Sequence, residues 1–364
     1  MTIRNITNFI EELAPLQYAE NFDNVGLLIG NFNTQISNVL VTLDTLEETV
    51  DEAIARNCNL IISFHPIIFS GLKKLNGTTY VERVVLKAIK NNIAIYATHT
   101  ALDNSFLGVS AKICEILGLQ NTKILIPKRG VIKKLTTYVP IDSLEKIRTA
   151  LFKAGAGNIG NYNNCSFTVN GNGTYQGDEN SNPILGKRGE FHTENETFLS
   201  LLFESKNEQK ILNTLHKHHP YEEVAYNVVT TDNIHQNIGM GMIGELPKPI
   251  DETTFLSFLK KRMNINCVRH SSLLRKPIKK VAVLGGSGSF GIPNAINSKA
   301  DIYISSDFKY HDFFKSEKRI LLADIGHYES EQFTKNLLVE YLTKKFTNFA
   351  IILSEKSTNP IYYL

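Results

Sequence analysis

Four side chains of this sequence could together bind divalent metal ions: His65, Asp103, His327 and Glu331. Each is expected where an apolar strand ends or a helix begins, which is where open α/β sheets place their ligand sites. Imidazole and carboxylate groups suit zinc, iron and manganese, and such a set, unlike a closed structural zinc site, leaves coordination positions for water. The four residues therefore predict a site for metal-assisted hydrolysis, provided that the two ends of the chain fold against each other.

The spacing within the pairs supports this prediction without deciding it. His327 and Glu331 are four residues apart, so in a helix they would lie on one face. Glu331 could instead interact only with the helix dipole, while His327 packs under a loop. His99 and Asp103 have the same spacing and the same two interpretations. His65 comes from a third strand end and favours the shared metal site.

A further pair, Asp307 and His311, follows a strand that is expected to end at Ser305. Histidine is the usual general acid or base near neutrality, so this pair could transfer protons, or it could support the metal ligands from outside. Asp307 could equally cap a helix. We take His311 and His99 as the candidate catalytic residues, because either could move protons beside a metal ion.

Two other motifs favour structural interpretations. Residues 285–289, Gly-Gly-Ser-Gly-Ser, could hold a phosphate, but they match neither G-x-G-x-x-G nor the P-loop, and a tight turn accounts for them better. Residues 216–219, His-Lys-His-His, have the composition of a metal cluster. They lie at an expected helix end, however, where imidazoles commonly meet free carbonyl groups.

The metal-binding candidates depend on alternating strands and helices that position them. The strand over residues 60–63 delivers His65, and the strand over residues 94–98 delivers His99. This alternation predicts a mostly parallel sheet covered by helices on both faces. The other elements expected in the first segment are a strand at 39–43 and helices at 7–13, 46–57, 81–90 and 110–117.

The middle of the chain has a different pattern. From about residue 133 the order becomes β-α-β-β-α-β over roughly a hundred residues, which is typical of a ferredoxin-like insert. The α/β pattern then resumes, with strands at 280–284, 301–305 and 319–324 and a helix at 330–344.

The composition is that of an ordinary globular protein. A chain of 364 residues with 42% hydrophobic content can bury a sizeable core and suggests about two or three domains. A net charge of +3 is too small to indicate a nucleic-acid partner. The four cysteines lack C-x-x-C spacing, and neither a signal peptide nor a membrane-spanning run is evident, so we expect a cytoplasmic protein with reduced thiols.

Several stretches resemble the family of GTP cyclohydrolase 1 type 2 homologues, also called Nif-three-like metal proteins. The segment at residues 219–223, HPYEE, also resembles the inserted domain of the longer bacterial members, which is similar to the PII and CutA trimers. The family stretches occur in the right order across nearly the whole chain: DNVGL at 23–27, SFHPIIF at 63–69, THTALD at 98–103, GGSG at 285–288, DFKYH at 307–311 and GHYESE at 326–331.

The resemblance implies a Nif-three-like layered α/β fold with mostly parallel sheets and an inserted ferredoxin-like α+β (PII/CutA-like) domain. The metal-binding domain would comprise residues 1–130 and 235–364, and the insert would comprise residues 131–234. The family also implies a toroidal homohexamer whose cavity encloses the metal ions.

The metal site that the resemblance implies contains two ions, lined by His65, Asp103, His327 and Glu331. One departure matters, because the family usually has two adjacent histidines before the proline and the first of these positions is Phe64 here. The ion held by His65, His327 and Glu331 should therefore be the better occupied. A second ion would depend on Asp103, Glu331, His99 and water.

The family name implies an enzyme in which metal-bound hydroxide attacks a carbon of a guanine nucleotide, such as C8, and opens the ring. Two alternatives stay open. In the first, the chain is a non-catalytic interaction protein, with metals that stabilise the ring and an insert that binds a small effector or a partner. In the second, it hydrolyses another nucleotide or a phosphoester.

Overall fold

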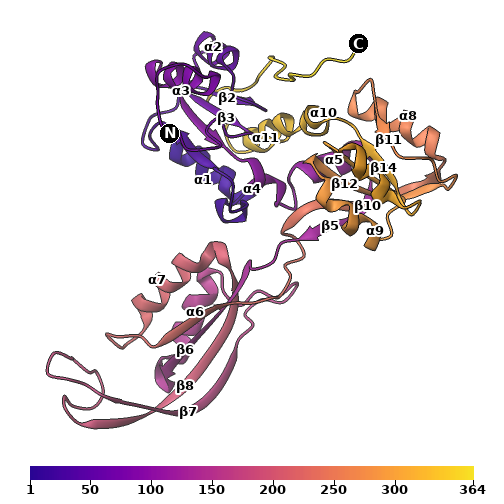
Figure 1. Ribbon diagram of the computed structural model, residues 1–364. Coiled ribbons are helices and arrows are strands. Elements are labelled where there is room, and N and C mark those ends of the chain that lie inside the picture. Colours follow the sequence, from indigo (N-terminus) through magenta and orange to yellow (C-terminus); the bar gives the residue numbers. More distant parts are fainter. The chain divides into compact units, whose positions relative to one another are not determined.

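The computed structural model describes all residues from 1 to 364 and divides into two compact units (Figure 1). Unit 1 combines both ends of the chain, Met1–Pro127 and Asn237–Leu364, and unit 2 is the intervening segment Lys128–Gln236. Both units are mixtures of α-helices and β-strands. None of the helices is both long and apolar enough to span a bilayer.

The first sheet of unit 1 has five strands in the order β1-β4-β3-β2-β15. The four strands from β4 to β15 are parallel to their neighbours, and β1 is antiparallel to β4 at the edge. Alternate side chains face two helical layers, because Val41 packs in one core with α1 whereas Leu40 packs in another with α2 and α3. The elements are β1 (Gly26–Ile29), β2 (Val39–Thr42), β3 (Leu60–Ser63), β4 (Ala94–Ala97), β15 (Ile351–Leu353), α1 (Ile3–Leu13), α2 (Glu47–Ala55), α3 (Tyr80–Lys90) and α11 (Thr334–Thr343).

The second sheet of unit 1 has six strands in the order β11-β14-β13-β12-β10-β5. Only β12, β13 and β14 are parallel to one another, and the other three pairings are antiparallel. The expectation of mostly parallel sheets is therefore right for the first sheet and wrong for the second. The elements are β5 (Gln120–Pro127), β10 (Gly239–Ile250), β11 (Arg269–His270), β12 (Ile278–Ser287), β13 (Ile302–Ser306), β14 (Leu321–Asp324), α4 (His99–Asp103), α5 (Val109–Leu117), α8 (Glu252–Met263), α9 (Ile292–Asn297) and α10 (His327–Glu331).

The antiparallel pair β5 and β10 explains this mixture. Pro127 pairs with Gly239, so the chain leaves for unit 2 and returns at neighbouring points of the sheet. The two segments of unit 1 also exchange strands, because β5 joins the second sheet and β15 joins the first. The two segments thus do not form halves of one sheet, and each sheet needs both ends of the chain.

Unit 2 has a four-stranded antiparallel sheet in the order β7-β8-β6-β9, with the element order β-α-β-β-α-β. One face packs against α6 and α7 through buried residues such as Leu135, Leu199, Ile147 and Ile211. The helices therefore cover a single face of this sheet. The elements are β6 (Ile132–Pro140), α6 (Leu144–Ala154), β7 (Phe167–Gln176), β8 (Phe191–Glu204), α7 (Glu208–His218) and β9 (Tyr226–Thr230).

Two expected helix boundaries are wrong. Helix α1 begins at Ile3, with Thr2 at the N-cap, because Ile3, Ile6 and Ile10 form one continuous buried stripe. The helix expected over residues 330–344 is two helices, α10 and α11, with a break between Glu331 and Thr334. As a result, His327 and Glu331 both lie within α10.

Candidate metal centre

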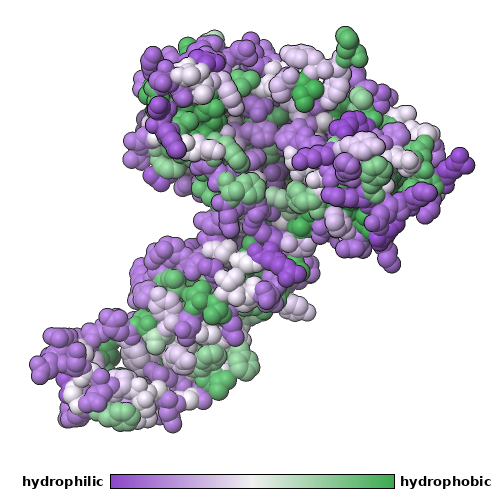
Figure 2. Space-filling model, viewed as in Figure 1, coloured by the Kyte–Doolittle hydropathy of each residue, from purple (hydrophilic) through white to green (hydrophobic).

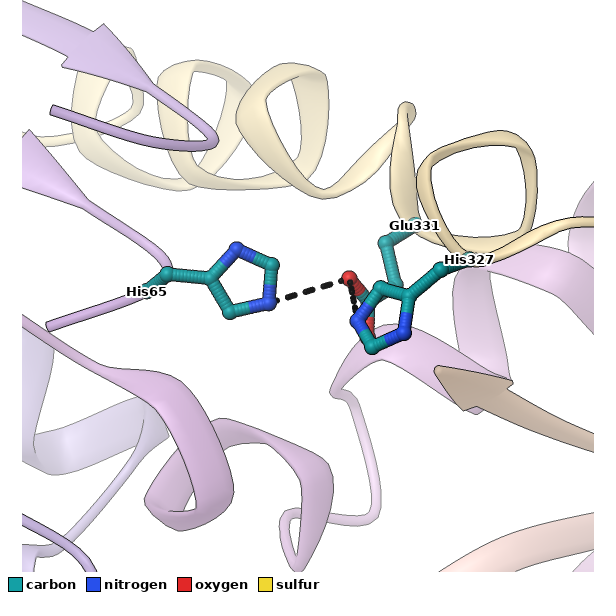
Figure 3. A group of neighbouring side chains, drawn as sticks. All are labelled: His65, His327 and Glu331. Carbon is teal, nitrogen blue, oxygen red and sulfur yellow. Dashed lines mark ion pairs between the residues drawn. The ribbon is translucent and has the colours of Figure 1, made fainter. Parts of the chain in front are cut away.

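Three of the four expected ligands converge from the two sheets of unit 1 (Figure 3). His65 lies just after β3 of the first sheet, whereas His327 and Glu331 are the first and last residues of α10, which follows β14 of the second sheet. One potential ligand atom from each residue lies within 4.8 Å of the other two. The i, i+4 spacing predicted that His327 and Glu331 share a helical face, and both point towards His65 in Figure 3.

The carboxylate of Glu331 lies between the two imidazole rings. Its Oε2 atom is 3.2 Å from Nε2 of His65 and 3.3 Å from Nε2 of His327. Glu331 is buried, and this oxygen has no hydrogen-bond partner. The two ion pairs are the only polar contacts of this buried oxygen, and both are long; a cation coordinated by all three atoms would satisfy it better. The donor set of two nitrogens and one oxygen fits zinc, iron or manganese.

A glycine makes room for this carboxylate. Gly286, in β12, has a φ angle of +70°, and a Cβ atom on it would lie 2.3 Å from Oε1 of Glu331. Its N–H group donates to Oγ of Ser330 at 2.8 Å, and the same hydroxyl donates to the carbonyl of His327 at 2.8 Å. The glycine motif at 285–288 thus allows α10 to approach β12 closely. This packing role differs from the phosphate binding that the sequence left open.

The charges at the centre are strongly coupled. Burial alone would lower the pKa of His65, but the carboxylates of Asp44 and Glu331 outweigh it and raise the pKa to about 10. Asp307 and Glu331 raise the pKa of His327 to about 10, against the effect of burial. Burial would raise the pKa of Glu331, but the two imidazoles lower it to about 2. In the absence of metal, the centre therefore holds protons where an ion would bind.

A carboxylate contacts the Nδ1 atom of each of the two histidines. Nδ1 of His65 lies 2.8 Å from Oδ1 of Asp44, and Nδ1 of His327 lies 2.6 Å from Oδ2 of Asp307. These contacts fix the rings so that Nε2 faces Glu331, as second partners of metal-bound histidines do. Asp307 therefore lies where it can support a metal ligand, which is one of the roles that the sequence left open for it. Asp44 was not expected, although it follows β2 just as His65 follows the neighbouring strand β3.

His99 lies beside the three ligands without belonging to their group. Its ring centroid is 5.3 Å from that of His65, and its Nδ1 atom is 2.7 Å from Oδ1 of Asp23. The contact with Asp23 leaves Nε2 as the available ring nitrogen. The backbone of His99 has a φ angle of +26°, and strain of this kind concentrates at functional sites. Phe64 is fully buried in the core of the first sheet, with its ring centroid 5.6 Å from that of His99.

The structure does not bring the remaining two predicted residues into the group. Asp103 lies at the end of α4, and desolvation and then the charge of Glu331 raise its pKa well above the ordinary value, so it is near the centre. It is not among the three residues whose ligand atoms converge. The side chain of His311 is exposed on a 3-10 helix (Tyr310–Ser316), where its ring neighbours are Tyr310 and Phe314. The catalytic role expected for His311 therefore stays a prediction.

A cavity of about 390 Å³ opens at the metal ligands and is lined on one side by the end of the chain. The lining includes His65, His99 and His327 together with apolar residues such as Phe69 and Ile361. Among the residues that follow β15, Thr358 donates a hydrogen bond of 2.5 Å from its hydroxyl to Oδ2 of Asp44. Asn359 donates from Nδ2 to Oε1 of Glu329 at 3.0 Å. The C-terminal residues therefore contact the site and line its cavity. Nothing in their sequence predicted this role.

The histidine-rich motif of unit 2 has the structural role that its position predicted. Nδ1 of His218 lies 2.9 Å from the carbonyl of Thr214 at the end of α7. Nε2 of His219 lies 2.9 Å from the carbonyl of Tyr138. These imidazoles satisfy backbone carbonyl groups rather than gathering around an ion.

Comparisons with known proteins agree over almost the full length of the chain. The sequence model of a family described as Duf34/NIF3 (NGG1p interacting factor 3) matches residues 1–360. A Bacillus subtilis protein named GTP cyclohydrolase 1 type 2 homolog is 36% identical over 371 residues, covering 99% of this chain and 98% of the relative. A crystal structure of a Bacillus cereus protein related to NIF3 has a TM-score of 0.82 and 34% identity, covering 100% of this chain and 99% of that one. The Staphylococcus aureus protein SA1388 has a TM-score of 0.78 and 27% identity, with the same coverage.

Proposed function

Because this chain belongs to the Duf34/NIF3 family, we propose that it is a metal-dependent hydrolase whose single well-occupied ion is held by His65, His327 and Glu331. The observation that carries the proposal is the buried Oε2 atom of Glu331, which faces two imidazole Nε2 atoms and has no hydrogen-bond partner. Three protein ligands leave open positions for water and substrate, as catalytic rather than structural sites do. Zinc, iron and manganese all fit the donor set.

A divalent ion bound there would lower the pKa of water and polarise a substrate bond. The residues around it have separate tasks. Asp44 and Asp307 hold the imidazoles of His65 and His327 in one orientation. His99, oriented by Asp23, can hold or donate a proton at Nε2 on the wall of the same cavity.

The name of the Bacillus subtilis relative suggests GTP as the substrate. The volume and lining of the cavity favour binding of a purine base rather than of the whole nucleotide. Its volume of about 390 Å³ is at the small end of typical ligand sites, and Phe69, Tyr328 and Ile361 provide apolar surface. No lysine or arginine lines it. We propose that the base enters beside the metal ligands and that the triphosphate stays outside.

The test is turnover of GTP by protein that has been stripped with a chelator and reloaded with zinc, iron or manganese. Mass spectrometry would detect the ring-opened nucleotide and released formate. We expect product with the reloaded protein and none with the stripped protein or with Glu331→Gln. The matched control is Glu340→Gln, an exposed residue of α11 whose carboxylate is paired with Lys112. A reloaded protein that opens no guanine ring in GTP or guanosine would contradict the proposed reaction.

Unit 2 supports a second proposal, in which the chain is a metal-stabilised interaction protein with a regulatory, PII/CutA-like insert. Hydrolysis at unit 1 does not require a separate ferredoxin-like unit. Figure 2 shows hydrophobic patches on the surface of unit 2. The exposed apolar residues of this unit include Phe167, which is 67% exposed, and Val229, which is 51% exposed. Such patches commonly mark contacts with other chains.

We propose a homohexamer as the assembled form in either case. Light scattering should give the mass of six chains, and a chelator should reduce it if the ions stabilise the ring. A monomeric mass in the presence of metal would contradict this assembly. All four cysteines are unpaired, which agrees with the proposed cytoplasmic location.

A further inference from the structure

Unit 2 contains a cavity of about 700 Å³ that the metal centre does not use. Its volume lies within the range of typical small-molecule sites. The cavity lies over the face of the sheet that α6 and α7 leave uncovered. Strand alternation places Leu199 against the helices and the neighbouring Phe198 on the cavity side.

Aromatic rings form much of the wall. The rings of Tyr138 and Phe198 have centroids 5.7 Å apart, and those of Tyr175 and Tyr221 are 6.1 Å apart. The loop between β7 and β8 contributes to the lining and is held in place by two hydrogen bonds. The hydroxyl of Tyr175 donates to the carbonyl of Leu185 at 2.7 Å, and the N–H group of Asn182 donates to Oε1 of Glu222 at 2.6 Å.

A buried carboxylate lies in this wall. Glu196, in β8, is 8% exposed and faces Gly171 across the β7–β8 pairing. Its side chain crosses Gly173, where a Cβ atom would lie 1.9 Å from Oε2. The chain therefore keeps glycine on β7 where the carboxylate of Glu196 needs room.

The groups around Glu196 do not supply a positive charge. The hydroxyl of Tyr221 is buried beside Glu196, and burial and then its contact with Glu196 raise the pKa of that hydroxyl. Burial lowers the pKa of the nearby His219, which favours its neutral form. None of the residues that line the cavity is a lysine, an arginine or a histidine. A buried carboxylate normally has a cationic partner, and here the wall provides only the neutral hydroxyl of Tyr221.

The other carboxylates of the wall have partners or lie at its edge. Asp178 accepts hydrogen bonds from the N–H groups of Asn180 and Ser181 within the loop. Glu222 accepts from Asn182, and Glu223 is exposed. Together with Glu196 they make the cavity acidic, which opposes the binding of phosphates and nucleotides.

We propose that this cavity binds a small organic cation, in which an ammonium or guanidinium group pairs with Glu196 and an apolar body packs against the aromatic rings. Cations are attracted to the faces of aromatic rings, and a desolvated carboxylate adds a charge-assisted hydrogen bond. The cavity volume of about 700 Å³ is large enough for such a molecule. The site is independent of the metal centre, so Glu331→Gln should leave it unchanged.

The test is calorimetric titration of the intact protein with phenethylamine, agmatine and choline, and with 2-phenylethanol as the neutral counterpart of phenethylamine. We expect at least one of the cations to bind, and phenethylamine to bind at least about tenfold more tightly than the alcohol. Glu196→Gln should weaken cation binding by at least about tenfold. Glu145→Gln, an exposed residue of α6 paired with Arg148, is the matched control and should bind like the wild type.

A second variant tests the cavity without changing its charge. A Cβ atom on Gly171 would meet nothing within 4 Å, so Gly171→Val fills space in the strand without a clash and should abolish cation binding. Thermal unfolding of each variant checks that it folds. Three results would overturn the proposal: equal affinity for amine and alcohol, wild-type cation affinity in Glu196→Gln, or binding of ATP or zinc at Glu196 with no binding of any cation in the panel.

Discussion

Asp44 lies 2.8 Å from Nδ1 of His65 and directs Nε2 of that ring towards Glu331. Asp307 has the same relation to His327 at 2.6 Å, on the other side of the centre. The two carboxylates come from different sheets, so both halves of the site are oriented independently before an ion arrives. This arrangement supports the proposal that the two histidines are metal ligands.

Replacing Asp44 should weaken metal binding although Asp44 is not itself a ligand. In Asp44→Asn the amide could still contact His65, but the negative charge that makes the imidazole a better ligand is lost. We expect a loss of roughly 10- to 100-fold in zinc affinity. Competition with a chromophoric chelator would measure it. Asp51→Asn, which removes a surface carboxylate paired with Lys87, is the control. Equal affinities of the two variants would show that Asp44 has no role at the centre.

Thr358 should act on the metal only through Asp44. Thr358→Val keeps the shape of the side chain and removes the hydroxyl that donates to Oδ2 of Asp44. We expect a loss of about 1 kcal/mol, or roughly fivefold in zinc affinity. In the double variant with Asp44→Asn the two effects should not add. Full additivity would mean that Thr358 influences the metal by another route.

The sequence predicted the three converging side chains better than the residues that support them. His65 and the His327–Glu331 pair were found because strand ends and i, i+4 spacing are local patterns. Asp44 follows the same strand-end rule, but it has no histidine nearby in sequence, and the acidic residues that follow it, Glu47 and Glu48, belong to the first turn of α2. Thr358 could not be predicted, because it reaches Asp44 from an irregular segment more than 300 residues away.

The fold was predictable where contacts are local and not where strands change sheets. The parallel unit from β2 to β4 followed from apolar runs separated by amphipathic helices. The antiparallel half of the second sheet did not, because β5 and β10 pair across the insertion of more than a hundred residues. His311 follows β13, as the sequence predicted, and its side chain is exposed on the short 3-10 helix there. Its catalytic role stays a prediction.

The metal-free protein should lose stability as the pH rises from neutrality. The pKa of His65 and His327 is about 10 in the fold and 6.5 ordinarily, so their contribution is complete below about 6.5 and is lost as the pH rises through about 10. The pKa of Glu331 is lowered to about 2, so its contribution is lost only as the pH falls from 4.5 through about 2.

Urea unfolding of chelator-treated protein between about pH 6 and pH 10 would measure this dependence. The free energy of unfolding should fall with pH in the wild type and fall less in Glu331→Gln, which lacks the charge that holds the protons. Zinc affinity should change in the opposite direction, because the ion displaces these protons and binds more tightly at higher pH. A wild-type slope equal to that of Glu331→Gln would argue against the coupled charges.

Gly286 should be needed for metal binding as well as for the fold. In Gly286→Ala the new methyl group meets Oε1 of Glu331, and the φ angle of +70° adds strain of about 1–2 kcal/mol. Gly118→Ala is a matched control, because Gly118 has a φ angle of +67° and a Cβ atom there meets nothing within 4 Å. Thermal unfolding should show both variants destabilised. Chelator competition should show lost zinc affinity only in Gly286→Ala, and retained affinity there would mean that Glu331 is not held as described.

The most direct measurement is an anomalous difference map from crystals of the native protein grown without chelator. It should show one strong peak within coordination distance of Nε2 of His65, Nε2 of His327 and Oε2 of Glu331, and the peak should be absent from crystals of Glu331→Gln. Absorption-edge data would identify the element. A native map without a peak among these three atoms, in protein supplied with zinc, iron and manganese, would contradict the proposed metal centre.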